Sequence, residues 1–231
     1  MKIDIKGSII SNDDQFIYDY FEMEATSPKK VNDLIAQAKA NEELEIEINS
    51  GGGSVFAGSE IYTALKSYKG NTIGRIVGIA ASAAGVAAMG VKKLLISPTA
   101  QIMIHNVSTI VAGDYRDLQH EADVIENMNK SIANAYALKT KIGQEELLGM
   151  MNNETWLNAQ QAKEKGFVDE IMFDEGNKLV ASFSKSQMLP AEVINKVRNQ
   201  LIEKKDKKNQ ELKVSNELDL AKARLKLRGN L

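Results

Sequence analysis

Two residues of this 231-residue chain carry side chains that could together hydrolyse an amide. Ser82 lies in a run of small residues, Ala80–Gly85, and His105 is one of only two histidines. A serine hydroxyl attacks a carbonyl carbon when a neighbouring imidazole takes its proton and later returns it to the leaving group. The chain has no Cys, which excludes a cysteine nucleophile, a thiolate metal site and disulfides. The sequence therefore predicts Ser82 as nucleophile and His105 as general base.

The same chemistry needs hydrogen-bond donors for the negative oxygen that forms on the substrate. Residues 51–53 are all glycine, and they follow a segment, Leu44–Ile48, that alternates strictly between apolar and acidic residues. Glycine readily adopts the backbone conformations that turn N–H groups toward one point. Ser82 is expected to begin a helix, where unpaired N–H groups and the helix dipole favour negative charge. We therefore expect an oxyanion site between the glycine turn and Ser82.

The elements that must position these residues follow from hydrophobic periodicity. Ser27-Pro28 is typical of a helix start, because Ser caps free N–H groups and Pro fits the first helical position. Strands that alternate with helices predict a layered α/β fold with a mostly parallel sheet. The predicted strands are 2–10, 44–48, 72–79, 93–97, 101–106 and 168–173, and the predicted helices are 28–40, 55–67, 80–90, 114–142, 144–151 and 159–165.

The composition changes after about residue 174. A charge run without an apolar face occupies 203–208, and the last residues are weakly amphipathic. We therefore predict two parts, a catalytic domain at 1–175 and a charged, partly helical C-terminal appendage at 176–231.

Composition also excludes several classes of function. The formal net charge of −2 gives no general reason to expect nucleic acid or a membrane surface as partner. The N-terminus lacks a secretory signal pattern, and the weakly polar stretch 76–91 is too short to span a bilayer, so a cytoplasmic location is expected. His120 lies among polar residues of a helix and is expected at the surface. No acidic or histidine cluster has ligand spacing, and no Lys-Ser/Thr follows the glycines, so neither a metal nor a nucleotide cofactor is predicted.

Four segments, in this order along the chain, resemble the Clp protease proteolytic-subunit family. Residues 48–58 resemble its motif Ile-Asn-Ser-Pro-Gly-Gly-Ser-Val-x-Ala-Gly, and residues 78–85 resemble its nucleophile segment. Residues 103–106 resemble its histidine segment, and residues 155–169 its closing segment. The similarity implies a layered α/β fold of the Clp protease and crotonase type, with a long oligomerisation helix.

The resemblance assigns roles position by position. Ser82 matches the nucleophile and His105 the base, and the backbone N–H groups of Gly52 and Ala83 match the oxyanion hole. The family's acid matches Glu154, whose extra methylene relative to Asp still lets its carboxylate reach an imidazole.

Two further sets of residues have expected roles. Asn152 or Asn153 could orient the imidazole if Glu154 does not. The residues expected to bind substrate are Gly51, Gly53, Ser54 and Asn106.

The sequence departs from the family at the turn, where Gly51 replaces a proline, and at the two ends of the chain. A short N-terminal segment and a long charged C-terminal one are more similar to Clp-like proteases of phage and prophage head-assembly modules. The resemblance thus implies ATP-independent processing of capsid, scaffold or portal proteins. It also implies a homo-oligomer, either a heptameric ring or stacked rings, in which helix 114–142 interleaves and 107–113 forms a strand pairing with substrate or with the opposite ring.

Other readings remain open at this point. The chain could serve a Clp ATPase in protein degradation, act on CoA thioesters as a crotonase-like enzyme, or be an inactive head-assembly scaffold. A membrane-associated Ser-Lys peptidase would need a lysine at Ser82 and a membrane anchor, and the sequence offers no anchor.

Overall fold

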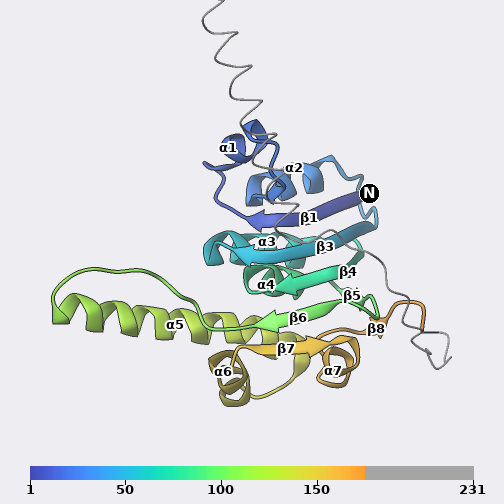
Figure 1. The fold of residues 1–231 in the computed structure, drawn as a ribbon. Coiled ribbons are helices and arrows are strands. Elements are labelled where there is room, and N and C mark those ends of the chain that lie inside the picture. The colour runs from blue at the N-terminus through green and yellow to red at the C-terminus, as the bar shows by residue number, and fades with distance from the viewer. Residues whose placement is uncertain (175–231) are drawn as a thin grey trace, which may run out of the picture. The chain divides into compact units, whose positions relative to one another are not determined.

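The computed structural model describes residues 1–174 as alternating strands and helices (Figure 1). The predicted appendage at 176–231 lies outside the described residues. The strands are β1 (Lys2–Ile9), β2 (Ala25–Thr26), β3 (Leu44–Gly53), β4 (Thr72–Ala81), β5 (Lys93–Ile96), β6 (Gln101–Ile104), β7 (Thr155–Asn158) and β8 (Glu170–Ile171). The helices are α1 (Gln15–Tyr20), α2 (Pro28–Gln37), α3 (Val55–Ser67), α4 (Ala83–Ala88), α5 (Tyr115–Thr140), α6 (Gln144–Asn152) and α7 (Ala159–Glu164).

The strands form one mostly parallel sheet, which confirms the predicted fold class. Its order is β2-β1-β3-β4-β5-β8, and β6 pairs with β4 and with β7. Within the described residues only the β6–β7 pair is antiparallel. The alternation in β3 buries Leu44, Ile46 and Ile48 on one face. Such a pattern places one face of each strand on the core.

Helices α3 and α4 cover the buried face of the sheet near its centre. Every residue of α4 is buried, and all are Ala, Gly or Val. A β-carbon on Gly58 of α3 would lie 2.7 Å from the carbonyl oxygen of Ala83. Small residues therefore let the two helices approach closely, and this contact fixes the start of α4.

Strand β4 changes its neighbour along its length, and this change positions its carboxyl end. Residues 73–76 pair with β5, whereas residues 79–81 pair with β6. The register against β3 shifts between Ile48 and Ser50, and the side-chain oxygen of Asn49 accepts a 3.3 Å hydrogen bond from the Ile79 N–H at this point. The end of β4 thus lies between the glycine turn and β6.

Helix α5 extends from the body as an arm (Figure 1). At 1.5 Å per residue its 26 residues span about 39 Å. Its buried residues all lie at or after Asn129, while Tyr115 and Leu118 are exposed. Among the described residues, no helix is both long and apolar enough to cross a membrane.

The structure corrects two local predictions. Helix α4 begins at Ala83 rather than at residue 80, because β4 continues to Ala81. Helix α1 lies in the connection between β1 and β2, where no helix was predicted, and it has no buried residue. Residues 107–113 form no strand within the single chain, and their pairing with substrate or with the opposite ring stays a prediction.

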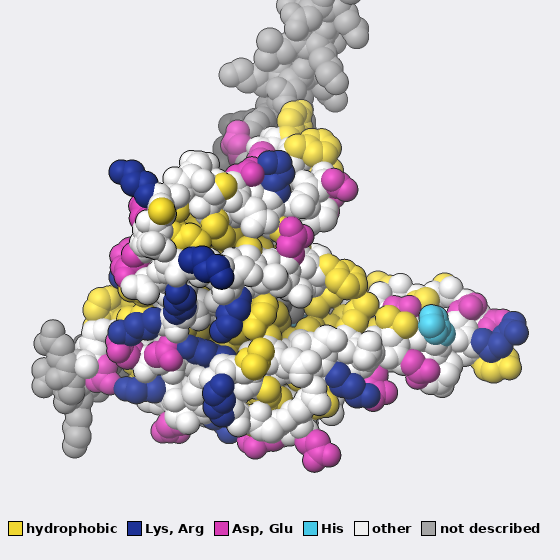
Figure 2. All heavy atoms as spheres, turned by 180° about the vertical axis from the view of Figure 1, so that it is seen from behind, with side chains coloured by type: hydrophobic (Ala, Val, Ile, Leu, Met, Phe, Trp, Pro, Cys, Tyr) yellow, Lys and Arg dark blue, Asp and Glu magenta, His cyan; other side chains and the backbone are white. Residues whose placement is uncertain are grey.

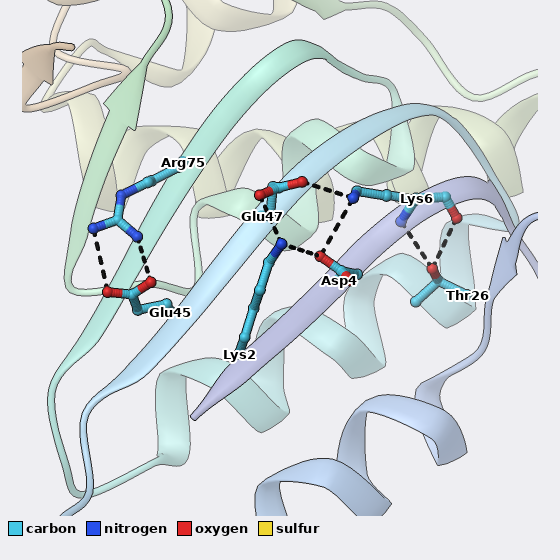
Figure 3. Close-up of polar contacts among 7 residues, drawn as sticks. All are labelled: Lys2, Asp4, Lys6, Thr26, Glu45, Glu47 and Arg75. Atoms are coloured by element: carbon cyan, nitrogen blue, oxygen red, sulfur yellow. Dashed lines mark hydrogen bonds and ion pairs between the residues drawn. The ribbon is translucent and has the colours of Figure 1, made fainter. Parts of the chain in front are cut away.

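The opposite face of the sheet carries paired charges (Figure 3). Glu47 on β3 forms ion pairs of 2.6 Å with Lys6 and 2.9 Å with Lys2, and Glu45 pairs with Arg75 at 2.7 Å. The hydrogen bond from Lys6, and then the one from Lys2, hold the pKa of Glu47 below its usual range. The hydrogen bond to Glu47 likewise raises the pKa of Lys2 and of Lys6. These cross-strand ion pairs neutralise charges on a partly exposed face of the sheet.

Candidate active site

Ser82 occupies the sharp turn between β4 and α4. Its backbone is left-handed, with φ 53° and ψ −126°. Its N–H donates a 2.9 Å hydrogen bond to the Met103 carbonyl, and its own carbonyl accepts one of 3.1 Å from the Val86 N–H. Such a conformation costs about 1–3 kcal/mol in a non-glycine residue and persists only where surrounding contacts impose it. A strained strand-to-helix turn of this kind presents a serine hydroxyl at the edge of a sheet.

His105 follows β6 directly and meets Ser82 from the neighbouring strand. Because Ala81 pairs with Met103, the ends of β4 and β6 lie side by side, and Ser82 and His105 follow these ends. The Nε2 atom of His105 lies 2.8 Å from the Ser82 Oγ. For the hydroxyl to donate, Nε2 must be unprotonated and the imidazole proton must be on Nδ1. The structure thus brings together the two residues predicted as nucleophile and base.

The glycine turn packs directly against the nucleophile. A β-carbon on Gly52, whose φ is 95°, would lie 2.7 Å from the Ser82 β-carbon and 3.0 Å from the Ala83 nitrogen. Only glycine fits there, so the turn and the start of α4 are in contact. The Gly52 N–H donates a 3.1 Å hydrogen bond to the Ser50 Oγ. The Ser50 hydroxyl in turn donates a 2.6 Å bond to the Gly7 carbonyl, which anchors the turn to β1.

A hollow of about 510 Å³ opens beside the Ser82–His105 pair. All four residues that were expected to bind substrate line it: Gly51, Gly53, Ser54 and Asn106. Its apolar lining comes from Val55, Val86, Met103, Ile132 and Tyr136. Burial raises the pKa of the Tyr136 hydroxyl well above its usual range, so that group is neutral. The hollow therefore offers an uncharged, largely apolar wall next to the nucleophile.

The structure does not bring Glu154 to His105. Glu154 is exposed, has a positive φ of 45°, and accepts a 3.2 Å hydrogen bond from the Trp156 Nε1. The amide oxygen of Asn152 accepts a 2.8 Å bond from the Asn106 Nδ2, next to His105 in the chain. Within residues 1–174, no side chain hydrogen-bonds to the Nδ1 of His105. The role of Glu154 as the acid stays a prediction.

Sequence reasoning missed three features of the site. Neither the Asn106–Asn152 bond nor the position of Tyr136 in the hollow was foreseen. Trp156 is the only tryptophan in the chain, and its link to Glu154 was not anticipated.

Comparison with known proteins extends over most of the described chain. The family model described as Clp protease matches residues 4–175. The ATP-dependent Clp protease proteolytic subunit 1 of Streptomyces avermitilis is 31% identical over 143 residues, which cover 60% of this chain and 65% of that protein. The corresponding subunit of Deinococcus radiodurans is 29% identical over 141 residues, covering 60% and 69%. The chain thus spans just under two thirds of the length of the Streptomyces relative.

A solved structure shows the same architecture. A mutant of ClpP1 from Listeria monocytogenes superposes with a TM-score of 0.61 at 25% sequence identity, over 76% of this chain and 92% of that one. The bent central strand, the glycine turn and the Ser82–His105 pair belong to the region that the family model covers. This chain is a member of the Clp protease family.

Proposed function

We propose that the chain is a serine endopeptidase that works through an acyl-enzyme. The observation that carries the proposal is the 2.8 Å contact between the Ser82 Oγ and the His105 Nε2 beside a substrate-sized hollow. His105 takes the hydroxyl proton as the Ser82 Oγ bonds to the substrate carbonyl carbon. The proton then passes to the leaving amine as the peptide C–N bond breaks. A water molecule, deprotonated by His105, hydrolyses the ester and restores Ser82.

The negative oxygen of the tetrahedral intermediate needs donors that are already in place. We propose the N–H of Ala83, the first residue of α4, as one donor and the N–H of Gly52 as the other. The contact between Gly52 and Ala83 supports a shared role. In this arrangement the Gly52 N–H divides its hydrogen bond between the Ser50 Oγ and the substrate oxygen.

Removal of either member of the pair tests the reaction. Ser82→Ala and His105→Ala are expected to lose labelling by a fluorophosphonate probe, because one removes the nucleophile and the other its base. His120→Ala is the matched control, since it removes the other histidine, which is exposed on α5. Gel fluorescence of the labelled proteins measures the outcome, and labelling that persists in both site variants would sink the assignment.

A second prediction concerns the third member of the site. We propose Glu154 for this role, since a carboxylate stabilises the imidazolium that forms when His105 takes the proton. Glu154→Gln keeps the shape and the acceptor for Trp156 but removes the charge, so kcat is expected to fall by roughly 100-fold or more. The comparison is Asn152→Ala, measured with the same peptide. Full activity of Glu154→Gln together with a loss in Asn152→Ala would transfer the role to Asn152.

The setting in which the peptidase works has two candidates. From the resemblance described above, we propose processing of capsid, scaffold or portal proteins without an ATPase. The relatives from Streptomyces avermitilis and Deinococcus radiodurans are ATP-dependent Clp protease proteolytic subunits, which favours a second candidate, degradation together with a Clp ATPase. A crotonase-like enzyme acting on CoA thioesters would not need the contact between Ser82 and His105. The match to the Clp protease family also argues against this function.

Co-expression separates these settings. The wild-type chain is produced with a candidate capsid, scaffold or portal protein, and new termini are mapped by mass spectrometry. Discrete cleavage that disappears in Ser82→Ala is expected. Intact partners, combined with degradation of an unfolded protein only when a Clp ATPase and ATP are added, would support the second candidate instead. If the chain cleaves proteins under neither condition, an inactive head-assembly scaffold becomes the favoured function.

We also propose a ring, because Clp proteases form oligomeric rings and this chain exposes apolar surface suited to one. The N-terminal half of α5 buries none of its side chains within the chain, and hydrophobic side chains gather where the arm leaves the body (Figure 2). An apolar groove of about 280 Å³ between α3 and α5 includes Val55, Tyr62 and Leu138.

Light scattering is expected to give a mass seven or fourteen times the 25.4 kDa of one chain. Leu118→Asp, on the exposed part of α5, should lower this mass by placing a charge in the interface. Phe21→Asp is the matched control, because Phe21 is also exposed but lies far from α5 in the sequence. A monomeric wild-type protein would contradict the ring.

A further inference from the structure

Trp156 lies on the sheet face that the catalytic hollow uses. It pairs with Met103 across the antiparallel β6–β7 ladder, and residues directly opposite in such a ladder point to the same face. Met103 lines the hollow, whereas the flanking Ile102 and Leu157 point into the core. The indole remains 46% exposed although it is the largest side chain of the strand. A large, half-exposed ring therefore lies on the same sheet face as the hollow, one strand beyond Met103.

The register gives the separation between the strand end next to Ser82 and the strand that carries Trp156. Ala81, Met103 and Trp156 form one row across β4, β6 and β7. Two strand spacings amount to about 10 Å between the Ala81 and Trp156 Cα atoms. An extended peptide advances about 3.3 Å per residue, so a substrate side chain roughly three residues from the cleaved bond reaches the indole.

The surroundings of the ring favour a cation. The Nε1 of Trp156 donates its 3.2 Å hydrogen bond to the Glu154 carboxylate, which fixes the ring and adds a negative charge at its edge. The neighbouring pair on this face, Gln101 and Asn158, is uncharged. Tryptophan is the aromatic side chain that binds cations best through its ring face.

We propose that Trp156 is a specificity-determining residue that binds an Arg or Lys side chain of the substrate about three residues from the cleaved bond. The inference rests on the proposed peptidase function and adds its substrate preference. Glu154 acts here as a positioning residue, since its carboxylate holds the indole through one oxygen.

Fluorescence tests binding without cleavage. Trp156 is the only tryptophan, so tryptophan emission reports on this site alone. In the Ser82→Ala variant, peptides with one Arg placed two to four residues to either side of the cleaved bond are added in turn. Emission should change at one or two of these placements, and Glu in the same position should cause no change. An emission that stays constant for every placement would overturn the proposal.

Kinetics test the consequence for cleavage. A peptide that the wild-type protein cleaves is resynthesised with Arg or Glu at the favoured position, and kcat/KM is compared. Arg is expected to be preferred by roughly tenfold. The preference should fall to within about twofold in Trp156→Ala. It should persist in Phe173→Ala, a control that removes a different aromatic side chain, which is 85% exposed. A preference that Trp156→Ala retains would contradict the role of the indole.

Different results would contradict the peptidase function and the role of Trp156. If the wild-type protein neither reacts with fluorophosphonate nor cleaves any peptide, the peptidase proposal fails. If it does both, but the Arg preference is absent or independent of Trp156, only the inference about Trp156 fails.

Discussion

The left-handed backbone of Ser82 is the constraint on which the site depends. The residue can hold φ 53° because its N–H is bound to the Met103 carbonyl and its carbonyl starts α4. The bond to Met103 requires β4 to leave β5 and pair with β6. The turn also needs Gly52, since any β-carbon there would collide with the serine. A sheet with a straight central strand would not place a hydroxyl between a glycine turn and a histidine.

The chemistry of the site follows from this geometry. The serine and the imidazole are within hydrogen-bond distance before substrate arrives, so the proton transfer needs no rearrangement of the pair. Three groups around the pair already have partners: Asn152 binds Asn106, Glu154 binds Trp156, and Gly52 binds Ser50. The side-chain oxygen of Asn106, by contrast, is buried without a hydrogen-bond partner within the described residues.

Much of this was predictable from local sequence. The N-terminal cap of α2 and the periodicity along α5 gave their elements to within three residues at each end. Strand β3 begins where its alternation predicts but ends at Gly53, five residues past the predicted end. The contact between Ser82 and His105 was predictable because carboxyl ends of neighbouring parallel strands meet at one edge. Helix α1 was not, since none of its side chains is buried and no apolar face marks it. The partners of Glu154 and Asn152 were not predictable either, because they depend on the backbone of the turn between α6 and β7, where Glu154 has a positive φ, and on side-chain rotamers.

A structure of the protein with a bound peptide boronate would show whether Ser82 is the nucleophile and where the oxyanion lies. The account predicts a covalent bond from the Ser82 Oγ to boron, with one boronate oxygen within hydrogen-bond distance of the Ala83 and Gly52 nitrogens. His105 should then donate to the other oxygen. A boronate bound at another residue, or one whose oxygens both turn away from the glycine turn toward solvent, would contradict the account.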